Sequence, residues 1–317
     1  MSPSDLNPTQ PTAPGSRSWR DQVWQLGAAM RPKQLAKNLL IYLAFFFTLG
    51  DNGADGFQEQ LELFGRATLG FALFSIVAGA TYIFNDYRDL VSDRLHPSKR
   101  LRPLAAGELS ARFGLPAALV LIAGGLSASF IVDTGFGVLV ALYLGITTAY
   151  NLRLKDQVIL DIFAIAAGFV IRSAAGAQII DVPISPWLYV MTSLGALFIA
   201  LSKRRAELAT LGEAGTSHRP ALEHYSVSLL DHFASVVAPA TVLAYTLYTF
   251  TADNLPSDNS MMLTIPFVLY GVLRYLFLVH NRNLGGSPEE VFLRDRPLLL
   301  TFVLWLASAS LILIVAD

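Results

Sequence analysis

Apolar residues in this chain occur in long uninterrupted blocks rather than at the two-residue or 3.6-residue spacing of soluble elements. Eight blocks contain no charged residue, and a ninth is equally apolar apart from Asp161 and Arg172. A helix of about 20 apolar residues is long enough to cross a bilayer. The pattern predicts an all-α, polytopic membrane protein, a bundle of nine transmembrane helices over residues 38–50, 67–85, 113–132, 134–152, 158–180, 182–202, 233–252, 259–273 and 297–316.

The boundaries of the predicted spans and of the domain follow from their flanks. The first and eighth blocks are short, so we expect those spans to extend across Lys37 and Arg274. Residues 1–16 are rich in Pro, Ser and Thr, which predicts a disordered tail ahead of a single catalytic domain over residues 17–317. An amphipathic helix at the membrane interface should begin that domain, with its apolar stripe at Trp19, Val23, Leu26 and Met30.

Composition agrees with a membrane protein. The chain is 53% hydrophobic and 15% charged, with a mean hydropathy of +0.49, which excludes a disordered chain and disfavours a soluble enzyme. Cysteine is absent, so disulfides and thiolate nucleophiles are excluded. The net charge of −1 gives no reason to expect a nucleic-acid partner.

Basic residues alternate between the connections. Of the 23 Lys and Arg, 20 lie on residues 1–37, 86–112, 153–157, 203–232 and 281–296, whereas the opposite connections hold only Arg66. The positive-inside rule then places the N-terminus in the cytoplasm, and nine spans place the C-terminus outside. The catalytic groups are therefore expected on the cytoplasmic connections of a protein of the inner (plasma) membrane.

Three aspartates follow the second span within the segment Asn85 to Asp93. If the helix continues past the membrane edge, Asp86, Asp89 and Asp93 fall within about 60° of arc. Their mutual repulsion is relieved by a divalent cation, and an all-oxygen set that includes Asn85 suits Mg²⁺, which takes other ligands from substrate phosphates.

A basic run, with Arg94, Lys99, Arg100 and Arg102, follows directly. Beside bound metal, such a run is suited to hold a diphosphate from a second side. The alternatives are a solvated helix end in which Arg88 and Arg94 neutralise the acids, and bases that simply rest on anionic lipid headgroups.

The combined stretch NDYRDLVSDRLHPSKRLRPLAAGEL resembles the first aspartate-rich motif of the UbiA superfamily of intramembrane prenyltransferases, NDxxDxxxD followed by bases. The resemblance implies a nine-helix bundle with a cytoplasmic-side active site, where Mg²⁺ on Asn85, Asp86, Asp89 and Asp93 holds a pyrophosphate leaving group. Further segments are similar to the branch that transfers phosphoribosyl to a polyprenyl (decaprenyl) phosphate in cell-wall arabinan synthesis; they lie at residues 31–38, 154–155, 203–208 and 288–296.

Two departures from the superfamily pattern stand out. A second acidic motif, DxxxD, normally follows the sixth span, whereas this chain has Ser202-Lys203-Arg204-Arg205-Ala206-Glu207 there. Bases in that place fit two phosphate-bearing substrates handled with fewer metal ions. The tyrosine–lysine motif is also altered, because Tyr150 and Lys155 are five residues apart instead of four.

The resemblance therefore implies Mg²⁺-dependent transfer of 5-phosphoribosyl from phosphoribosyl pyrophosphate (PRPP) to a polyprenyl phosphate. Asp86, Asp89 and Asp93 would act in catalysis by stabilising the departing diphosphate. Because a lipid phosphate is already anionic, no general base is assigned, and the histidines show no paired spacing. The substrate-binding candidates are Lys33, Lys37, Asn85, Arg94, Lys99, Arg100, Arg102, Lys155, Asp161, Lys203, Arg204 and Arg205.

The remaining polar positions have other expected roles. Lys33 and Lys37 are one α-helical turn apart and should share a face. Asp161 and Arg172 are about 16 Å apart along a helix, too far to pair, and we expect Arg172 and Arg274 to counter-charge buried acids. Ser287 to Glu290 have the order of a helix start.

Two other functions stay open. One is a prenyl diphosphate transferase that acts on an aromatic acceptor. The other is a transporter, suggested by the charged residues inside spans. A homo-oligomer is left open.

Overall fold

The computed structural model describes residues 18–48, 56–96, 98–183, 186–211, 220–252, 255–282, 291 and 294–315. The tail predicted over residues 1–16 and the helix start predicted at Ser287 to Glu290 lie outside these ranges.

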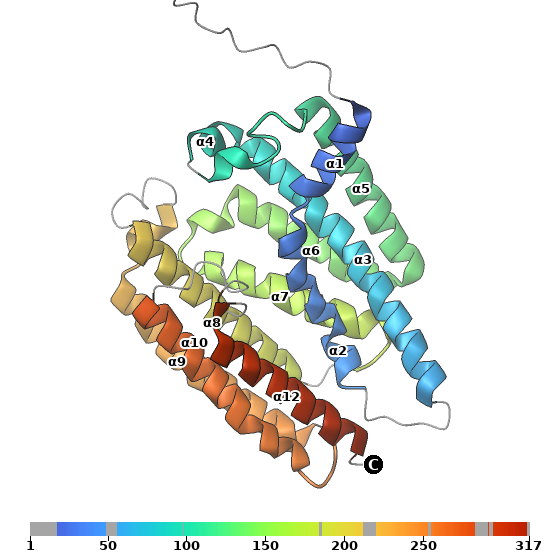
Figure 1. The fold of residues 1–317 in the computed structure, drawn as a ribbon, viewed down its shortest axis with the longest axis vertical. Coiled ribbons are helices and arrows are strands. Elements are labelled where there is room, and N and C mark those ends of the chain that lie inside the picture. Colours follow the sequence, from blue (N-terminus) through green and yellow to red (C-terminus); the bar gives the residue numbers. More distant parts are fainter. Residues whose placement is uncertain are drawn as a thin grey trace, which may run out of the picture.

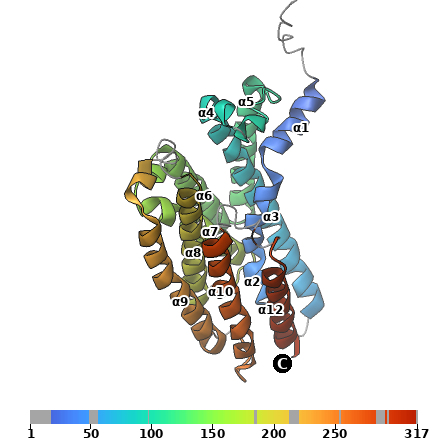
Figure 2. The same cartoon turned by 60° about the vertical axis from the view of Figure 1, so that its left-hand side comes forward.

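The described residues form helices packed side by side, and none of these residues is in a strand (Figures 1 and 2). Short 3₁₀ helices, labelled η, interrupt or join the α-helices. In chain order the elements are α1 (Trp19–Ala29), η1 (Pro32–Ile41), α2 (Tyr42–Phe46), α3 (Gly56–Arg88), α4 (Leu90–Leu95), η2 (Lys99–Leu101), α5 (Ala111–Val132), α6 (Thr134–Leu152), η3 (Leu154–Asp156), α7 (Leu160–Ile179), α8 (Pro186–Leu211), η5 (Pro220–His224), α9 (Val227–Thr251), η6 (Ser260–Thr264), α10 (Ile265–Arg282) and α12 (Arg296–Val315).

The apolar blocks correspond to long helices. Within the described residues, eight helices are long and apolar enough to cross a bilayer, and α6 has the bounds predicted for it. The eighth predicted span extends past Arg274 to Arg282, as expected. The all-α membrane architecture is therefore confirmed. The first predicted span is built differently, as η1 followed by the short α2, so the count of nine stays a prediction.

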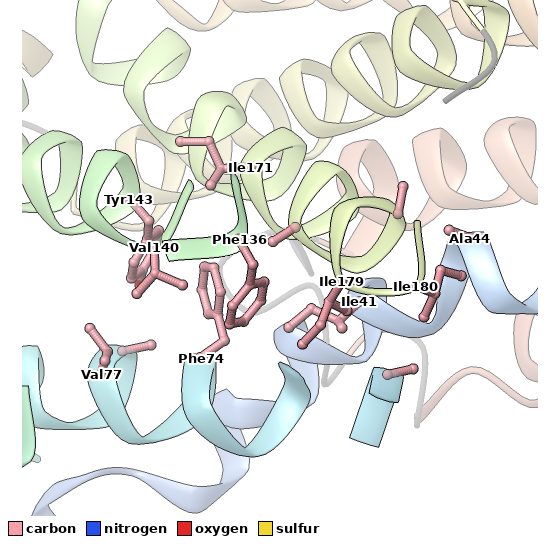
Figure 3. Packing of buried hydrophobic residues seen from close by; sticks show 14 residues of the cluster. Ile41, Ala44, Phe74, Val77, Phe136, Val140, Tyr143, Ile171, Ile179 and Ile180 are labelled. Carbon is pink, nitrogen blue, oxygen red and sulfur yellow. The ribbon is translucent and has the colours of Figure 1, made fainter. Parts of the chain in front are cut away.

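The broken first span is held by a close backbone contact with α7. A Cβ atom at Gly176 would overlap the backbone carbonyl of Ile41, the last residue of η1. Figure 3 shows Ile41 beside Ile179 of α7, with Phe74 of α3 and Phe136 of α6 close by in the same buried cluster. The missing side chain at Gly176 thus allows a non-α segment to lie against α7.

Arg172, on α7, links this segment to α6. Its guanidinium is buried and donates to Asn38 Oδ1 at 2.7 Å, to the Gly168 carbonyl at 2.5 Å and to the Tyr143 hydroxyl at 3.1 Å. It also lies 4.7 Å from the centroid of the Tyr143 ring. Among the described residues these partners are all neutral, so the expectation that Arg172 counter-charges an acid is wrong.

Arg274 does have an acidic partner. Its Nε and Nη2 donate to the two carboxylate oxygens of Asp295 at 3.1 and 2.8 Å, which joins α10 to the start of α12. This bidentate pair confirms the expected counter-charging at that position.

The N-terminal amphipathic helix is present, but its predicted stripe is divided. Leu26 and Met30 pack against a buried cluster shared by α3, α5 and the connection between them, whereas Trp19 and Val23 are exposed. Gln22, in contrast, is buried. Its side-chain amide donates to the Glu108 carbonyl at 3.1 Å and accepts from the Ser110 N–H at 2.9 Å. Docking to the protein therefore uses a polar position that the apolar pattern did not include.

We predict that Gly176→Ala destabilises the fold by about 1–3 kcal/mol, the usual effect of overpacking, because the methyl group meets a backbone carbonyl. The matched control is Gly145→Ala on α6, where an added Cβ meets nothing within 4 Å. Thermal unfolding in detergent should show a lower Tm for the first variant only. Equal Tm values for both variants would contradict the close contact.

Candidate active site at one end of the bundle

Two buried carboxylates converge on one arginine at the end of α3. Asp86 lies in the last turn of α3, and Asp93 lies on α4. Arg102 Nη1 donates to Asp86 Oδ1 at 3.1 Å and to Asp93 Oδ2 at 2.5 Å. Because a single nitrogen serves both groups, the two carboxylates point at one position, and that position holds positive charge.

The helical path through the motif explains this convergence. The Asp89 N–H bonds the Asn85 carbonyl at 3.0 Å, and the Asp93 N–H bonds the Asp89 carbonyl at 2.8 Å. These i to i−4 bonds carry the helix from α3 into α4 despite the break at Asp89. Asp86 and Asp93, seven residues apart, therefore keep a common face, as the sequence pattern predicted.

Asp89 does not join the pair. It is half-buried, and within the described part of the chain its carboxylate makes no hydrogen bond or ion pair. No three Asp, Glu or His residues in that part converge closely enough to ligate one metal ion. The structure thus brings together two of the three predicted aspartates, beside the half-buried Asn85.

The bases that neutralise these acids differ from the ones considered from the sequence. Arg88 donates to the Asn151 carbonyl, and Arg94 donates to the Ala105 carbonyl at 3.4 Å. Arg31, together with Arg102, pairs with Asp86 instead. The interpretation as a solvated helix end neutralised by Arg88 and Arg94 is therefore wrong.

Arg31 is a site residue that the sequence prediction did not include. It lies between α1 and η1 with φ 55° and ψ 68°, a left-handed conformation that costs a non-glycine residue energy. Its guanidinium pairs with Asp86 and lies 4.9 Å from the centroid of the Tyr82 ring. Glycine or asparagine would be the usual sign of a left-handed residue, and Arg31 is neither. The turn between α1 and η1 imposes the conformation.

The two lysines of η1 do not share a face. A 3₁₀ helix has three residues per turn, so residues i and i+3 align and residues i and i+4 do not. Gln34 and Lys37 accordingly meet, with Lys37 Nζ 2.6 Å from Gln34 Oε1, while Lys33 is exposed. The predicted common face of Lys33 and Lys37 is wrong because the segment is 3₁₀ rather than α-helical.

A second polar cluster surrounds Arg204, near the end of α8. This side chain is fully buried and donates to Asp161 Oδ2 and Glu207 Oε2, each at 2.5 Å, and to the Tyr150 hydroxyl at 3.0 Å. A guanidinium with two carboxylate partners is electrically satisfied, which removes much of the cost of burying it. The predicted site residues Asp161 and Arg204 are thus brought together, as each other's partners.

Strained backbone supports this cluster. Ile159 has φ 70° and ψ −47°, and the Leu160 N–H bonds the Val158 carbonyl at 2.8 Å, so the three residues form a γ-turn of the strained kind. The Ile159 N–H bonds the Tyr225 hydroxyl at 2.6 Å, and that hydroxyl donates to Asp161 Oδ1 at 2.9 Å. Burial, with the neighbouring Asp161 carboxylate, raises the pKa of Tyr225 to about 12, so the phenol keeps its proton at neutral pH.

The other basic residues predicted for the site fall into three groups. Arg205 pairs with Asp231 at 2.6 Å and also donates to the Val279 carbonyl at 3.1 Å. Lys155 and Lys203 are half-buried and have no hydrogen-bond or ion-pair partner in the part of the chain that the structure describes. Arg94, Lys99 and Arg100 are exposed.

The last turn of α6 joins the two clusters. Arg88, beside Asp89, donates to the Asn151 carbonyl, and the neighbouring Tyr150 bonds Arg204. The acidic pair and the Arg204 cluster therefore lie on either side of residues 150–151, at the same end of the bundle. One end of the bundle thus holds acids, Asp86 and Asp93, suited to bind a cation, and bases, Lys155 and Lys203, suited to bind anions.

Comparisons with known proteins agree with this architecture. A solved structure of a UbiA homolog from Archaeoglobus fulgidus bound to GPP and Mg²⁺ superposes with a TM-score of 0.69, covering 91% of this chain and 99% of that one, at 18% identity. Decaprenyl-phosphate phosphoribosyltransferase of Mycobacterium tuberculosis (strain ATCC 25618 / H37Rv) is 33% identical over 282 residues, 89% of this chain and 92% of that protein. The protein with the same name in Corynebacterium glutamicum is 32% identical, over 87% of this chain and 83% of that protein.

The model of the UbiA prenyltransferase family matches residues 39–206, which include both the acidic pair and the core of the Arg204 cluster. Together with the relatives that match along almost the whole chain, this shows that the protein is an integral membrane protein of the UbiA prenyltransferase family.

Proposed function

We propose that this protein transfers 5-phosphoribosyl from PRPP to a polyprenyl phosphate and releases pyrophosphate. The relatives from Mycobacterium tuberculosis and Corynebacterium glutamicum, which align over most of both chains, bear the name of that activity. Release of pyrophosphate and recognition of a second phosphate require two separate places that bind anions. The acidic couple, with a metal ion, is suited to the first, and the lysines near Arg204 are suited to the second. The observation that carries the proposal is the acidic couple, Asp86 and Asp93, together with two half-buried lysines, Lys155 and Lys203, on the segments that carry the separate Arg204 cluster.

Magnesium fits the acidic couple. Asp86 and Asp93 already converge on one cationic nitrogen, their donors are all oxygen, and Asn85 and Asp89 flank them. Mg²⁺ is commonly bound by one or two carboxylates, with substrate phosphates and water completing its ligands. When bound there, the ion would neutralise charge on the diphosphate.

The residues of this chain would then assist loss of that diphosphate. A lipid phosphate oxygen forms the new bond to the anomeric carbon, and the bond from that carbon to the diphosphate oxygen breaks, with its electron pair leaving on pyrophosphate. Arg31 and Arg102 carry guanidinium donors beside the acidic couple, where they are placed to stabilise the developing negative charge. No proton transfer is required, because the attacking phosphate is already an anion.

We assign the phosphate of the lipid acceptor to the Lys155 and Lys203 side. Both lysines are half-buried, and their ammonium groups make no ion pair or hydrogen bond with described residues. Arg204 and Arg205, in contrast, are paired with carboxylates. Arg204 pairs with two carboxylates, Asp161 and Glu207, so its buried charge has counter-ions from this chain without a second metal ion. A site with one metal position and lysines beside it fits two phosphate-bearing substrates better than it fits a neutral aromatic acceptor.

The first prediction concerns the activity itself. Purified protein with Mg²⁺ should move label from PRPP into an organic-extractable lipid when polyprenyl phosphate is present, and omission of either substrate should abolish the transfer. Transfer only from a prenyl diphosphate to an aromatic acid would reject the proposal in favour of a prenyl diphosphate transferase.

Asp89→Asn is expected to lower kcat by about 10²–10³-fold, the effect of removing one stabilising group from a developing diphosphate. Asp89 makes no ion pair in the described part of the chain, so the fold should keep its Tm. Asp21→Asn on the exposed part of α1 is the matched control and should retain full activity. Near-normal turnover in Asp89→Asn would contradict a role in holding the metal and diphosphate.

Lys203→Gln and Arg204→Gln should have different effects although the residues are adjacent. The first variant is expected to raise KM for the lipid acceptor and leave the Tm unchanged. The second removes the ion-pair partner of the buried Asp161 and of the half-buried Glu207 and should cost about 3–5 kcal/mol of stability. Steady-state kinetics and thermal unfolding separate the two effects, and an unchanged KM for both substrates in Lys203→Gln would exclude it from anion binding.

A further inference from the structure

The acidic motif has an exposed apolar back. Phe84, Tyr87, Val91 and Leu95 recur at i, i+3, i+7 and i+11 from the end of α3 through α4, and all four are exposed. Val91 and Leu95 expose 77% and 84% of their surface. At 100° per residue this stripe lies about opposite Asp86 and Asp93 on the same helical path. One side of the motif therefore carries the carboxylates of the site, and the other side exposes large apolar and aromatic side chains.

Exposed bases border this apolar stripe. Arg94, Lys99 and Arg100 are exposed, and Leu101 between them and Arg102 is 74% exposed. Arg102 alone among the bases that follow the motif reaches the acidic pair. We call the set Phe84, Tyr87, Val91, Arg94, Leu95, Lys99, Arg100 and Leu101 the docking face.

Exposure of large apolar side chains to water is unfavourable, so a surface that combines them with bases indicates a contact surface. Exposed apolar patches mark contact surfaces, and bases around such a patch are attracted to anionic lipid headgroups, by about 1 kcal/mol each near the membrane surface. The exposed stripe begins at Phe84, because Ala80 and Val77, four and seven residues earlier on the same face of α3, are buried in the protein.

A second element at the same end points to the same environment. Figures 1 and 2 both show α1 and α4 at the end of the molecule where α5 begins. Trp19 and Trp24 of α1 are exposed there. Tryptophan is enriched where membrane and water meet, because its ring is amphipathic. Two elements that flank the acidic pair thus present interfacial side chains.

We propose that the docking face is seated in the headgroup and upper acyl region of an anionic leaflet, with Arg94, Lys99 and Arg100 on lipid phosphates. The carboxylates of Asp86 and Asp93 then open at the depth of the lipid phosphates rather than above the membrane. This inference goes beyond the proposed function and does not depend on it, since the surface would dock whichever substrates the site takes.

The absence of cysteine from the chain allows a direct test by site-directed spin labelling. Leu95→Cys and Leu101→Cys are labelled with a nitroxide in full-length protein, in nanodiscs of phosphatidylcholine with phosphatidylglycerol. Collision rates with oxygen, which partitions into lipid, and with a water-soluble nickel chelate report the depth of each label. Both positions are exposed, so labelling should leave the Tm unchanged.

The expected result is an oxygen-to-nickel collision ratio above unity at both positions. The matched control is Ser92→Cys, exposed on the same short helix but turned away from the stripe, where the ratio should be lower. Replacement of Arg94, Lys99 and Arg100 by Gln should lower the ratios in these discs, as should discs of phosphatidylcholine alone.

Three outcomes would overturn the proposal. A ratio below unity at both leucines would place the face in water. Protection from both reagents would show that a second copy or another part of the chain covers it. Equal ratios with and without anionic lipid would exclude the role of the three bases. None of these measurements involves turnover, so their failure is distinct from failure of the proposed reaction.

Discussion

The structure depends on how charge is neutralised where water is scarce. A buried carboxylate or guanidinium is tolerated only with partners that replace its hydration, and removal of one partner leaves the other at high energy. Asp86 and Asp93 satisfy this condition through Arg102 and Arg31, and Asp161 satisfies it through Arg204 and Tyr225. These pairings join α3 to α4 and α7 to α8, with Arg31, Arg102 and Tyr225 supplied by the connections.

The same constraint gives the two halves of the site different characters. The acidic pair receives its cations from connections between helices, since Arg31 lies between α1 and η1 and Arg102 follows η2. Arg204 is instead enclosed by helices and held by two carboxylates and a phenol. Under the proposed function, an incoming cation and diphosphate would compete with the first set of contacts, whereas the second set, one guanidinium between two carboxylates, would stay paired.

Two of the four non-glycine residues with positive φ in the described part of the chain lie at these clusters. Arg31 pairs directly with Asp86. The Ile159 N–H bonds the hydroxyl of Tyr225, which is part of the Arg204 cluster. Unfavourable backbone conformations persist only where surrounding contacts impose them. Here the ion pair of Arg31 and the hydrogen bond from Ile159 to Tyr225 supply those contacts, so backbone and side-chain placement support each other.

The amino-acid sequence determined the elements that local composition controls. Apolar blocks specify spans because lipid requires every backbone group to be bonded within its own helix, and the i, i+7 spacing already placed Asp86 and Asp93 on one face. Other outcomes needed contacts between segments distant in the chain. The segment η1, whose last residue Ile41 lies against Gly176, is a 3₁₀ helix, and that form separates Lys33 from Lys37. The partners of each charge, such as Arg31 for Asp86 or Asp161 for Arg204, were likewise decided by tertiary structure, because electrostatic pairing depends on distance in space and the spacing along a chain does not report it.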